Sequence, residues 1–134
     1  MQQRTAYLSK LIGIYCILAA APLILRRETS VAAVMELVHS APASFVLGMV
    51  IVAAGLALVL GHNTWSGGAA PVIVTLVGWA TLSKGLLFLF LSPDEMTSLL
   101  LAAHYDQFSQ VYGAASLVLG LYLTYAGYAP KAAR

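Results

Sequence analysis

The stretch FVLGMVIVAAGLALVLG, residues 45–61, contains no charged side chain and no side chain with a strong hydrogen-bonding group. A helix of about 20 residues, rising 1.5 Å per residue, crosses the roughly 30 Å hydrocarbon core of a bilayer. In lipid, the backbone polar groups must be satisfied within the segment, which favours a helix. The stretch therefore predicts a transmembrane helix from Phe45 to Gly61.

Three further stretches share this apolar character. They run from Tyr7 to Leu25, from Pro71 to Leu91 and from Phe108 to Tyr128. Hydrophobic residues make up 60% of the 134-residue chain and charged residues only 9%, whereas a soluble domain carries about 25% charged residues. The alternating pattern of a membrane β-barrel is absent from the sequence. We therefore predict an all-α membrane protein of four transmembrane helices in a single domain, residues 1–134.

The first apolar stretch also fits a rival interpretation, a cleaved signal peptide. Arg4 and Lys10 precede or open the run, and the alanines at 19–21 resemble a cleavage site. The run continues past that site through Pro22 and residues 23–25. This continuation favours a transmembrane helix.

Four spans place both termini on one side of the membrane. The basic residues on that side are Arg4, Lys10, Lys131 and Arg134. The opposite side has Arg26 and Arg27, together with all five acidic residues. Lys and Arg are enriched in cytoplasmic loops. Because four basic residues lie on the side of the termini and two on the opposite side, we predict that both termini are cytoplasmic.

The chain resembles itself at an offset of 65 residues. The matching pairs include Leu11 and Leu76, Gly13 and Gly78, His39 and His104, Gly48 and Gly113, and Gly55 and Gly120. Each half also has an apolar stripe with helical spacing between its two spans. The stripes are Val31, Val34, Met35 and Val38 in one half, and Met96, Leu99, Leu100 and Ala103 in the other. We therefore predict two short interfacial helices and a two-fold (2+2) pseudo-repeat, with halves of about 1–65 and 66–134.

Local signals predict where the two short helices begin. Ser92 can cap a helix, Pro93 suits its first position and Glu95 completes a capping box. Thr29 or Ser30 is the expected cap of the earlier helix.

Glycines recur every seven residues in the second and fourth spans, which places each set on one helix face. They are Gly48 and Gly55 in the second span, and Gly113, Gly120 and Gly127 in the fourth. Small residues let helices approach closely in lipid. We expect the second span to pack on the fourth, with a self-association face as the alternative.

Two motifs, GHNTW at residues 61–65 and VTLVGWATLSKG at residues 74–85, resemble a family of small four-span bacterial integral membrane proteins. Members pair a His-Asn-x-Trp loop with a Gly-Trp…Lys-Gly third span, and the resemblance covers residues 42–93. It implies a bacterial inner-membrane location and this architecture, and it supplies no reaction. The residues that it marks are His62, Asn63, Trp65, Gly78, Trp79, Lys84 and Gly85.

Lys84 interrupts the third span about 10 Å below its outer end. A lysine at the centre of a transmembrane helix costs about 2.5–3.5 kcal/mol on insertion. Three interpretations remain open: the side chain snorkels to the acidic outer side, it locks helices or subunits together as a fixed cation, or it binds an anion or relays a proton. The candidate partners on the outer side are Glu28, Glu36, Asp94 and Asp106.

The loop after the second span is expected to form an interfacial turn near the cytoplasmic face. It contains His62, Asn63 and Trp65, and Trp commonly anchors at headgroup depth. The alternative is a small polar site closed by this loop. Because His62 and Lys84 lie toward opposite faces, we do not expect them to share one site.

His39 and His104 are expected to be satisfied interfacial histidines. Haem ligation needs histidines that face each other across a bundle, and these two lie outside the apolar runs. A zinc site formed by His39, His104 and a carboxylate is the other alternative. Cys16, the single cysteine, is expected to be a small buried hydrophobe.

The sequence contains no hydrolase nucleophile elbow, phosphate loop or paired-carboxylate site. Its net charge of +2 is spread out, without the basic cluster that binds nucleic acid. We predict a non-enzymatic accessory or scaffold subunit without a cofactor, acting through helix packing in the bilayer as a homo-oligomer or with another membrane protein. The alternatives are a small oligomeric transporter or channel-like protein with Lys84 in a polar path, and a redox enzyme using haem or quinone.

Overall fold

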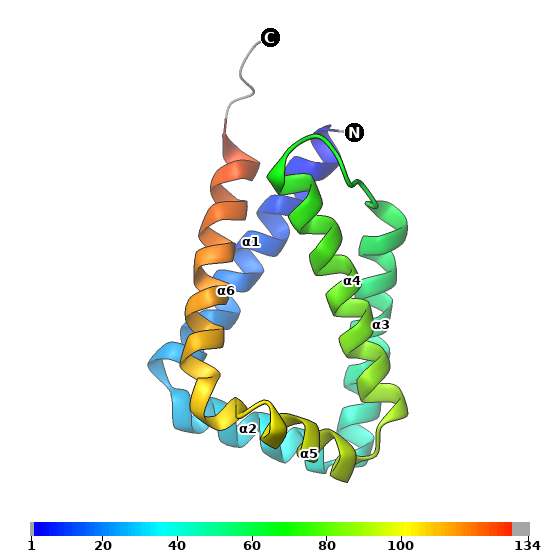
Figure 1. The fold of residues 1–134 in the computed structure, drawn as a ribbon, viewed down its shortest axis with the longest axis vertical. Coiled ribbons are helices and arrows are strands. Elements are labelled where there is room, and N and C mark those ends of the chain that lie inside the picture. The colour runs from blue at the N-terminus through cyan, green and yellow to red at the C-terminus, as the bar shows by residue number, and fades with distance from the viewer. Residues whose placement is uncertain (1, 130–134) are drawn as a thin grey trace.

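A computed structural model describes residues 2–129 of the chain. Within this part, six α-helices follow one another through short connections (Figure 1). They are α1 (Gln2–Leu25), α2 (Arg27–His39), α3 (Ala41–Gly61), α4 (Ala69–Phe90), α5 (Pro93–Ala102) and α6 (Tyr105–Tyr128). The all-α prediction is confirmed. Lys131 and Arg134, which entered the charge comparison, lie outside the described residues.

Three of the described helices, α1, α3 and α4, are long and apolar enough to cross a membrane. They match the first three apolar stretches of the sequence, with α4 ending one residue before the predicted end at Leu91, and α3 is the most apolar of them. α6 has a similar length, 24 residues, but five tyrosines and a polar first turn lower its hydropathy. The membrane character of the chain therefore rests on α1, α3 and α4.

The four long helices form two antiparallel pairs, α1 with α6 and α3 with α4 (Figure 1). Gly113, near the start of α6, lies against Ile24 near the end of α1, and Gly127 at the end of α6 lies against Lys10. Gly55 of α3 faces α4. The expected packing of the second span on the fourth is therefore wrong, because each glycine stripe faces a different partner helix.

Glycine is required where the backbones of the paired helices come closest. A Cβ atom on Gly55 would lie 2.5 Å from the backbone nitrogen of Leu82 in α4. A Cβ atom on Gly120 of α6 would lie 2.7 Å from the carbonyl oxygen of Gly13 in α1. Real Cβ contacts are essentially never shorter than 3.0 Å, so a larger residue must force the helices apart. Such close packing is what holds helices together where the solvent is lipid.

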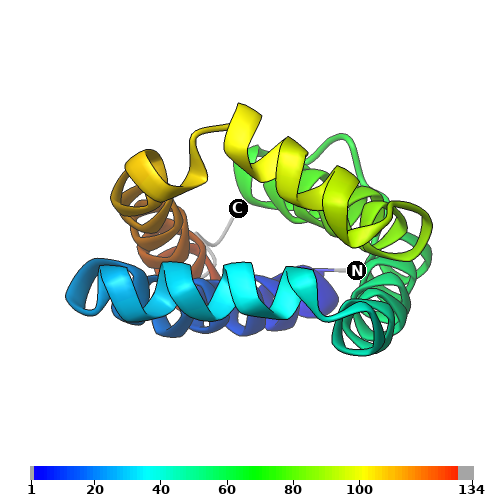
Figure 2. The same cartoon turned by 90° about the horizontal axis from the view of Figure 1, so that it is seen from below.

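The two pairs converge at the end where α1 begins and α6 ends, and they separate toward the opposite end (Figure 1). At the converging end, Ile12 of α1, Val74 of α4 and Leu123 of α6 form a buried cluster. At the opposite end, α2 and α5 lie side by side, and each connects one pair to the other (Figure 2). The molecule is a frame with two helix pairs as its sides, and α2 and α5 form its base.

The predicted start of α5 is confirmed by its hydrogen bonds. The backbone N–H of Glu95 donates to Ser92 Oγ at 3.3 Å, and the backbone N–H of Ser92 donates to the Glu95 carboxylate at 2.8 Å. These two bonds form the predicted capping box, with Pro93 at the first helical position. The box fixes the point at which the chain turns from α4 into the base.

The predicted cap of the earlier short helix is wrong. α2 begins at Arg27, before both Thr29 and Ser30. The Ser30 hydroxyl donates instead to the carbonyl oxygen of Pro22 in α1, at 2.9 Å. Ser30 therefore ties α2 to the end of α1 rather than capping a helix.

We expect the start of α5 to loosen in acid. The backbone hydrogen bond from Ser92, and then the bond with its side chain, hold the pKa of Glu95 below its ordinary value of 4.5. A carboxyl group with a lowered pKa contributes stability that is complete above the unfolded pKa and is lost as the pH falls through the folded pKa. The amide of Ser92 should therefore lose protection from hydrogen exchange below pH 4.5, after correction for intrinsic rates.

The Glu95→Gln variant is the matched control for this acid effect, since glutamine keeps the shape of the side chain and does not titrate. Its Ser92 amide should show the same protection above and below pH 4.5. An acid-induced loss of equal size in Glu95→Gln and in the wild type would contradict the role of the carboxylate.

Candidate functional site

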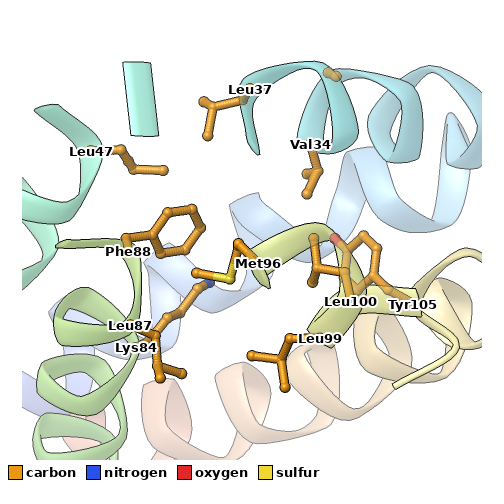
Figure 3. A pocket seen from close by; sticks show the side chains of 11 residues that line it. Val34, Leu37, Leu47, Lys84, Leu87, Phe88, Met96, Leu99, Leu100 and Tyr105 are labelled. Atoms are coloured by element: carbon orange, nitrogen blue, oxygen red, sulfur yellow. The ribbon is translucent and has the colours of Figure 1, made fainter. Parts of the chain in front are cut away.

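Lys84 lies on α4, and its side chain extends into a cavity of about 360 Å³ above the base of the frame (Figure 3). The wall of this cavity comes from α2, α3, α4, α5 and the first residue of α6. The lining residues are Ala33, Val34, Leu37, Leu47, Lys84, Leu87, Phe88, Met96, Leu99, Leu100 and Tyr105. We call this space the Lys84 cavity.

Hydrocarbon dominates the wall of the Lys84 cavity. Among the described residues that line it, Lys84 is the one charged group, and the phenol of Tyr105 is the other polar side chain. Figure 3 shows the Lys84 side chain directed toward Met96, which is buried on α5. Lys84 is itself exposed, and where lipid surrounds it, its ammonium group is costly unless a counter-charge or hydrogen-bond acceptor meets it.

Lys84 forms no ion pair with any of the candidate acidic residues, Glu28, Glu36, Asp94 and Asp106. Within residues 2–129, Lys84 has no hydrogen-bond or ion-pair partner. The carboxylate of Glu95 is engaged in the capping box. The guanidinium of Arg27 donates a hydrogen bond to the backbone carbonyl oxygen of Asp106, at 2.5 Å. The ammonium of Lys84 is therefore presented to the cavity without a counter-charge from the described chain.

Tyr105 places a neutral hydroxyl group at another side of the same cavity. Its ring stacks on that of Tyr112, with centroids 5.9 Å apart and an angle of 18° between the planes. A tyrosine phenol has an ordinary pKa of about 10. The phenol is therefore protonated at neutral pH and available to donate a hydrogen bond.

The apolar stripes of the two short helices contribute to this wall. Val34 of α2, and Met96 and Leu99 of α5, line the cavity, whereas the predicted interfacial helices would lay these stripes on the acyl chains. Val38 is fully buried, and Met96 is only 5% exposed. The stripes thus face the interior of the frame in part. The helical spacing indicated a buried face, but it did not indicate what covers that face.

His39 and His104 lie in different surroundings. His39 ends α2, and its Nδ1 lies 2.6 Å from the carbonyl oxygen of Met35, to which a ring N–H can donate. His104 separates α5 from α6 with a left-handed φ of 50°, and its ring is edge-on to Phe108. No group of three His, Cys, Asp or Glu side chains within residues 2–129 is arranged to hold a metal ion. The zinc-site alternative therefore gains no support.

The loop between α3 and α4 is tied to the first turns of α4. His62 is buried, and its Nε2 lies 3.3 Å from the carbonyl oxygen of Pro71. The N–H of Thr64 donates to Oγ1 of Thr75 at 3.0 Å, and Thr75 is also buried. Asn63 and Trp65 of the same loop are exposed. Sequence reasoning missed Thr75, because a lone threonine inside an apolar run carries no distinctive signal.

The structure does not bring the two polar motifs together. Lys84 lies thirteen residues beyond Pro71, which is about 20 Å along α4. His62 and Lys84 therefore belong to opposite ends of the helix, as predicted. Trp79 lies between them, 43% exposed, and does not line the Lys84 cavity.

Comparison with known proteins gave no matching family model, curated protein or solved structure. The resemblance of residues 42–93 to small four-span bacterial membrane proteins therefore stays a prediction.

Proposed function

We propose that the chain is a non-enzymatic four-span protein of the bacterial inner membrane, acting as an accessory or scaffold subunit through helix packing. The spans are α1, α3, α4 and α6, both termini are cytoplasmic, and α2 and α5 lie in the outer interface. One observation carries the scaffold role: an apolar opening lies between the two tightly packed helix pairs.

The pairing of α6 with α1 supports a fourth span. α1 is long and apolar enough to cross a membrane, and α6 lies against it from Gly113 to Gly127. Asp106, in the first turn, is the single charged residue of α6. A helix that accompanies a membrane span over this length lies at the same depth, and its 24 residues exceed the roughly 20 that a bilayer requires.

The glycine contacts of the two pairs support a pseudo-repeat. Gly48 of α3 lies against Leu89 of α4, and Gly113 of α6 lies against Ile24 of α1. Gly48 shifted forward by 65 residues is Gly113, and Leu89 shifted back by 65 residues is Ile24, so the first contact corresponds to the second. In the same way the contact of Gly55 with Leu82 corresponds to that of Gly120 with Ile17. A two-fold axis between the pairs accounts for both correspondences.

The opening between the pairs supports the scaffold role. It is a shallow, open hollow of about 670 Å³, lined by α6 and by one residue of α4. Its lining residues are Ile73, Val111, Ala114, Ala115, Val118, Leu119 and Tyr122. In lipid, a neighbouring helix gains stability from close contact with small residues rather than from escaping water. Two adjacent exposed alanines on α6 suit such an approach by a partner helix or a second copy.

The alternative of a transporter or channel-like protein rests on Lys84. Its unpaired ammonium faces a cavity, which favours an anion-binding role over a purely structural one. The wall of that cavity is hydrocarbon apart from Lys84 and Tyr105, whereas a conducting path needs polar groups along its length. The geometry therefore favours the scaffold proposal.

The number of spans is testable with reporter fusions. Four spans place the end of α6 on the same side as the start of α1, and three spans place it on the opposite side. We expect a green fluorescent protein fused after residue 134 to fluoresce, and alkaline phosphatase fused after residue 92 to be active. Active alkaline phosphatase after residue 134 would contradict the four-span proposal.

The scaffold role is testable by cross-linking in membranes. In a Cys16→Ser background, Ala115→Cys with a bifunctional maleimide should give one discrete product, of twice the mass for a second copy or of another defined mass for a different partner. Val50→Cys, an exposed position on α3, is the matched control and should give no such product. The proposal fails if both variants give the same products, or if Ala115→Cys gives monomer alone.

A further inference from the structure

The Lys84 cavity has a charge that the described chain leaves unbalanced. Lys84 has no hydrogen-bond or ion-pair partner within residues 2–129, and no carboxylate is among the residues lining the cavity. In a medium of low dielectric, a bare ammonium is costly and gains most from a directly bound anion. The cavity therefore has one position at which an anionic group is stabilised.

The rest of the wall sets the character of the bound molecule. Val34, Leu37, Phe88, Met96 and Leu99 present hydrocarbon to the space. A small hydrophilic anion such as phosphate would lose its hydration on entry and regain only one charged contact. A molecule with an anionic head and an apolar tail matches both parts of the wall, because the tail gains burial while the head meets Lys84.

The volume limits the size of that molecule. About 360 Å³ lies within the roughly 300–1,000 Å³ of pockets that bind small molecules. A medium-length single alkyl chain with its head group, about twelve non-hydrogen atoms, is a ligand of that class. Figure 3 shows Lys84 and Tyr105 on different sides of this space.

We propose that the Lys84 cavity binds a single-chain amphiphilic anion, a carboxylate or phosphate monoester. Lys84 holds the anionic head, and the side chains of α2 and α5 surround the tail. This inference goes beyond the scaffold role, since it concerns a different cavity from the opening between α4 and α6. It needs no partner helix, and therefore either proposal can fail without the other.

Met96 makes the binding measurable at the site itself. The full chain, labelled with ¹³C at the methionine methyl groups, is placed in nanodiscs of neutral phosphatidylcholine and titrated with decanoate, which has about the required number of atoms. The Met96 methyl signal should shift and saturate, whereas the signal of Met49, 54% exposed on α3, should stay unchanged. Decanol, of nearly equal length but uncharged, should bind at least about tenfold more weakly.

Three substitutions assign the binding to the lysine. Lys84→Met should weaken decanoate binding about tenfold or more, and Lys84→Arg should retain it, because arginine keeps the charge. Lys10→Met removes a lysine near the other end of the frame, where it lies over the ring of Tyr128, and should leave binding unchanged. If Lys84→Met fails to fold, Ala33→Leu fills the cavity from α2 and should also weaken binding, with the charge retained.

Comparison of decanoate with decyl phosphate distinguishes the two head groups. Tighter binding of either one supports an amphiphilic anion and identifies the preferred head group. Equal binding supports a site that recognises the negative charge and not the type of head group. Three outcomes would overturn the proposal: no shift of Met96 with either anion, equal binding of decanol and decanoate, or undiminished binding in Lys84→Met.

Discussion

The Gly55→Ala variant should be about 2 kcal/mol less stable than the Gly61→Ala variant, although both lengthen one side chain of α3 by one methyl group. At Gly55 the new Cβ would lie 2.5 Å from the backbone nitrogen of Leu82 and 2.6 Å from its Cα. Backbone atoms cannot rotate away as a side chain can, so α3 and α4 must separate. At Gly61 nothing lies within 4 Å of the added methyl group.

The comparison of two variants removes the ambiguity of a single glycine substitution. Alanine is a better helix former than glycine by about 1 kcal/mol in a helix interior, which partly offsets the clash at Gly55. Gly61, at the end of α3, experiences a smaller gain of the same sign and no clash, so its stability should change by less than about 0.5 kcal/mol. Unfolding in mixed micelles of increasing denaturing-detergent fraction, followed by circular dichroism, measures both variants.

The same experiment tests whether the two helix pairs are equivalent. Gly120→Ala in α6 would place a Cβ 2.7 Å from the carbonyl oxygen of Gly13 and 2.9 Å from the Ile17 side chain. We expect a loss close to that of Gly55→Ala. Equal stability of Gly55→Ala and Gly61→Ala would show that the backbones of α3 and α4 do not approach as described.

The sequence was sufficient to locate the helices because the length of an apolar run is itself the physical requirement for a membrane helix. The run at residues 45–61 lies within α3, and the Ser92–Glu95 signal marks the start of α5. Which of the long helices pack against each other was not predictable in this way. A seven-residue glycine spacing indicates that a helix has a close-packed face, but an isolated stripe does not specify which helix meets it.

The candidate site was predictable to a similar extent. Lys84 was conspicuous in sequence because a charge in an apolar run is costly. Its surroundings come from five helices, and the shape of the cavity depends on how α2 and α5 cross the base. That crossing follows from the splayed arrangement of the pairs, which no local pattern encodes. None of the candidate acidic partners lines the cavity.

Thr75→Val should reduce stability by about 2 kcal/mol, because it leaves the part-buried backbone N–H of Thr64 without an acceptor. Thr75 is 1% exposed. Its Oγ1 accepts from the N–H of Thr64 at 3.0 Å and donates to the carbonyl oxygen of Thr64 or of Pro71, at 3.0 and 3.1 Å. Valine fills nearly the same volume, so the loss isolates hydrogen bonding from packing. The Thr64 amide should also lose protection from hydrogen exchange in this variant.

Thr124→Val in α6 is the matched control, since it makes the same chemical change at a hydroxyl that forms no hydrogen bond in the described part of the chain. Within residues 2–129, Oγ1 of Thr124 is buried and has no hydrogen-bond partner. Removing an unsatisfied buried hydroxyl deletes a desolvation cost and no bond, so stability should be unchanged or higher by up to about 1 kcal/mol. Thr75→Ser, which keeps the hydroxyl, should retain most of the wild-type stability. If Thr75→Val and Thr124→Val lose stability equally, the threonine bridge between the α3–α4 loop and α4 contributes nothing beyond packing.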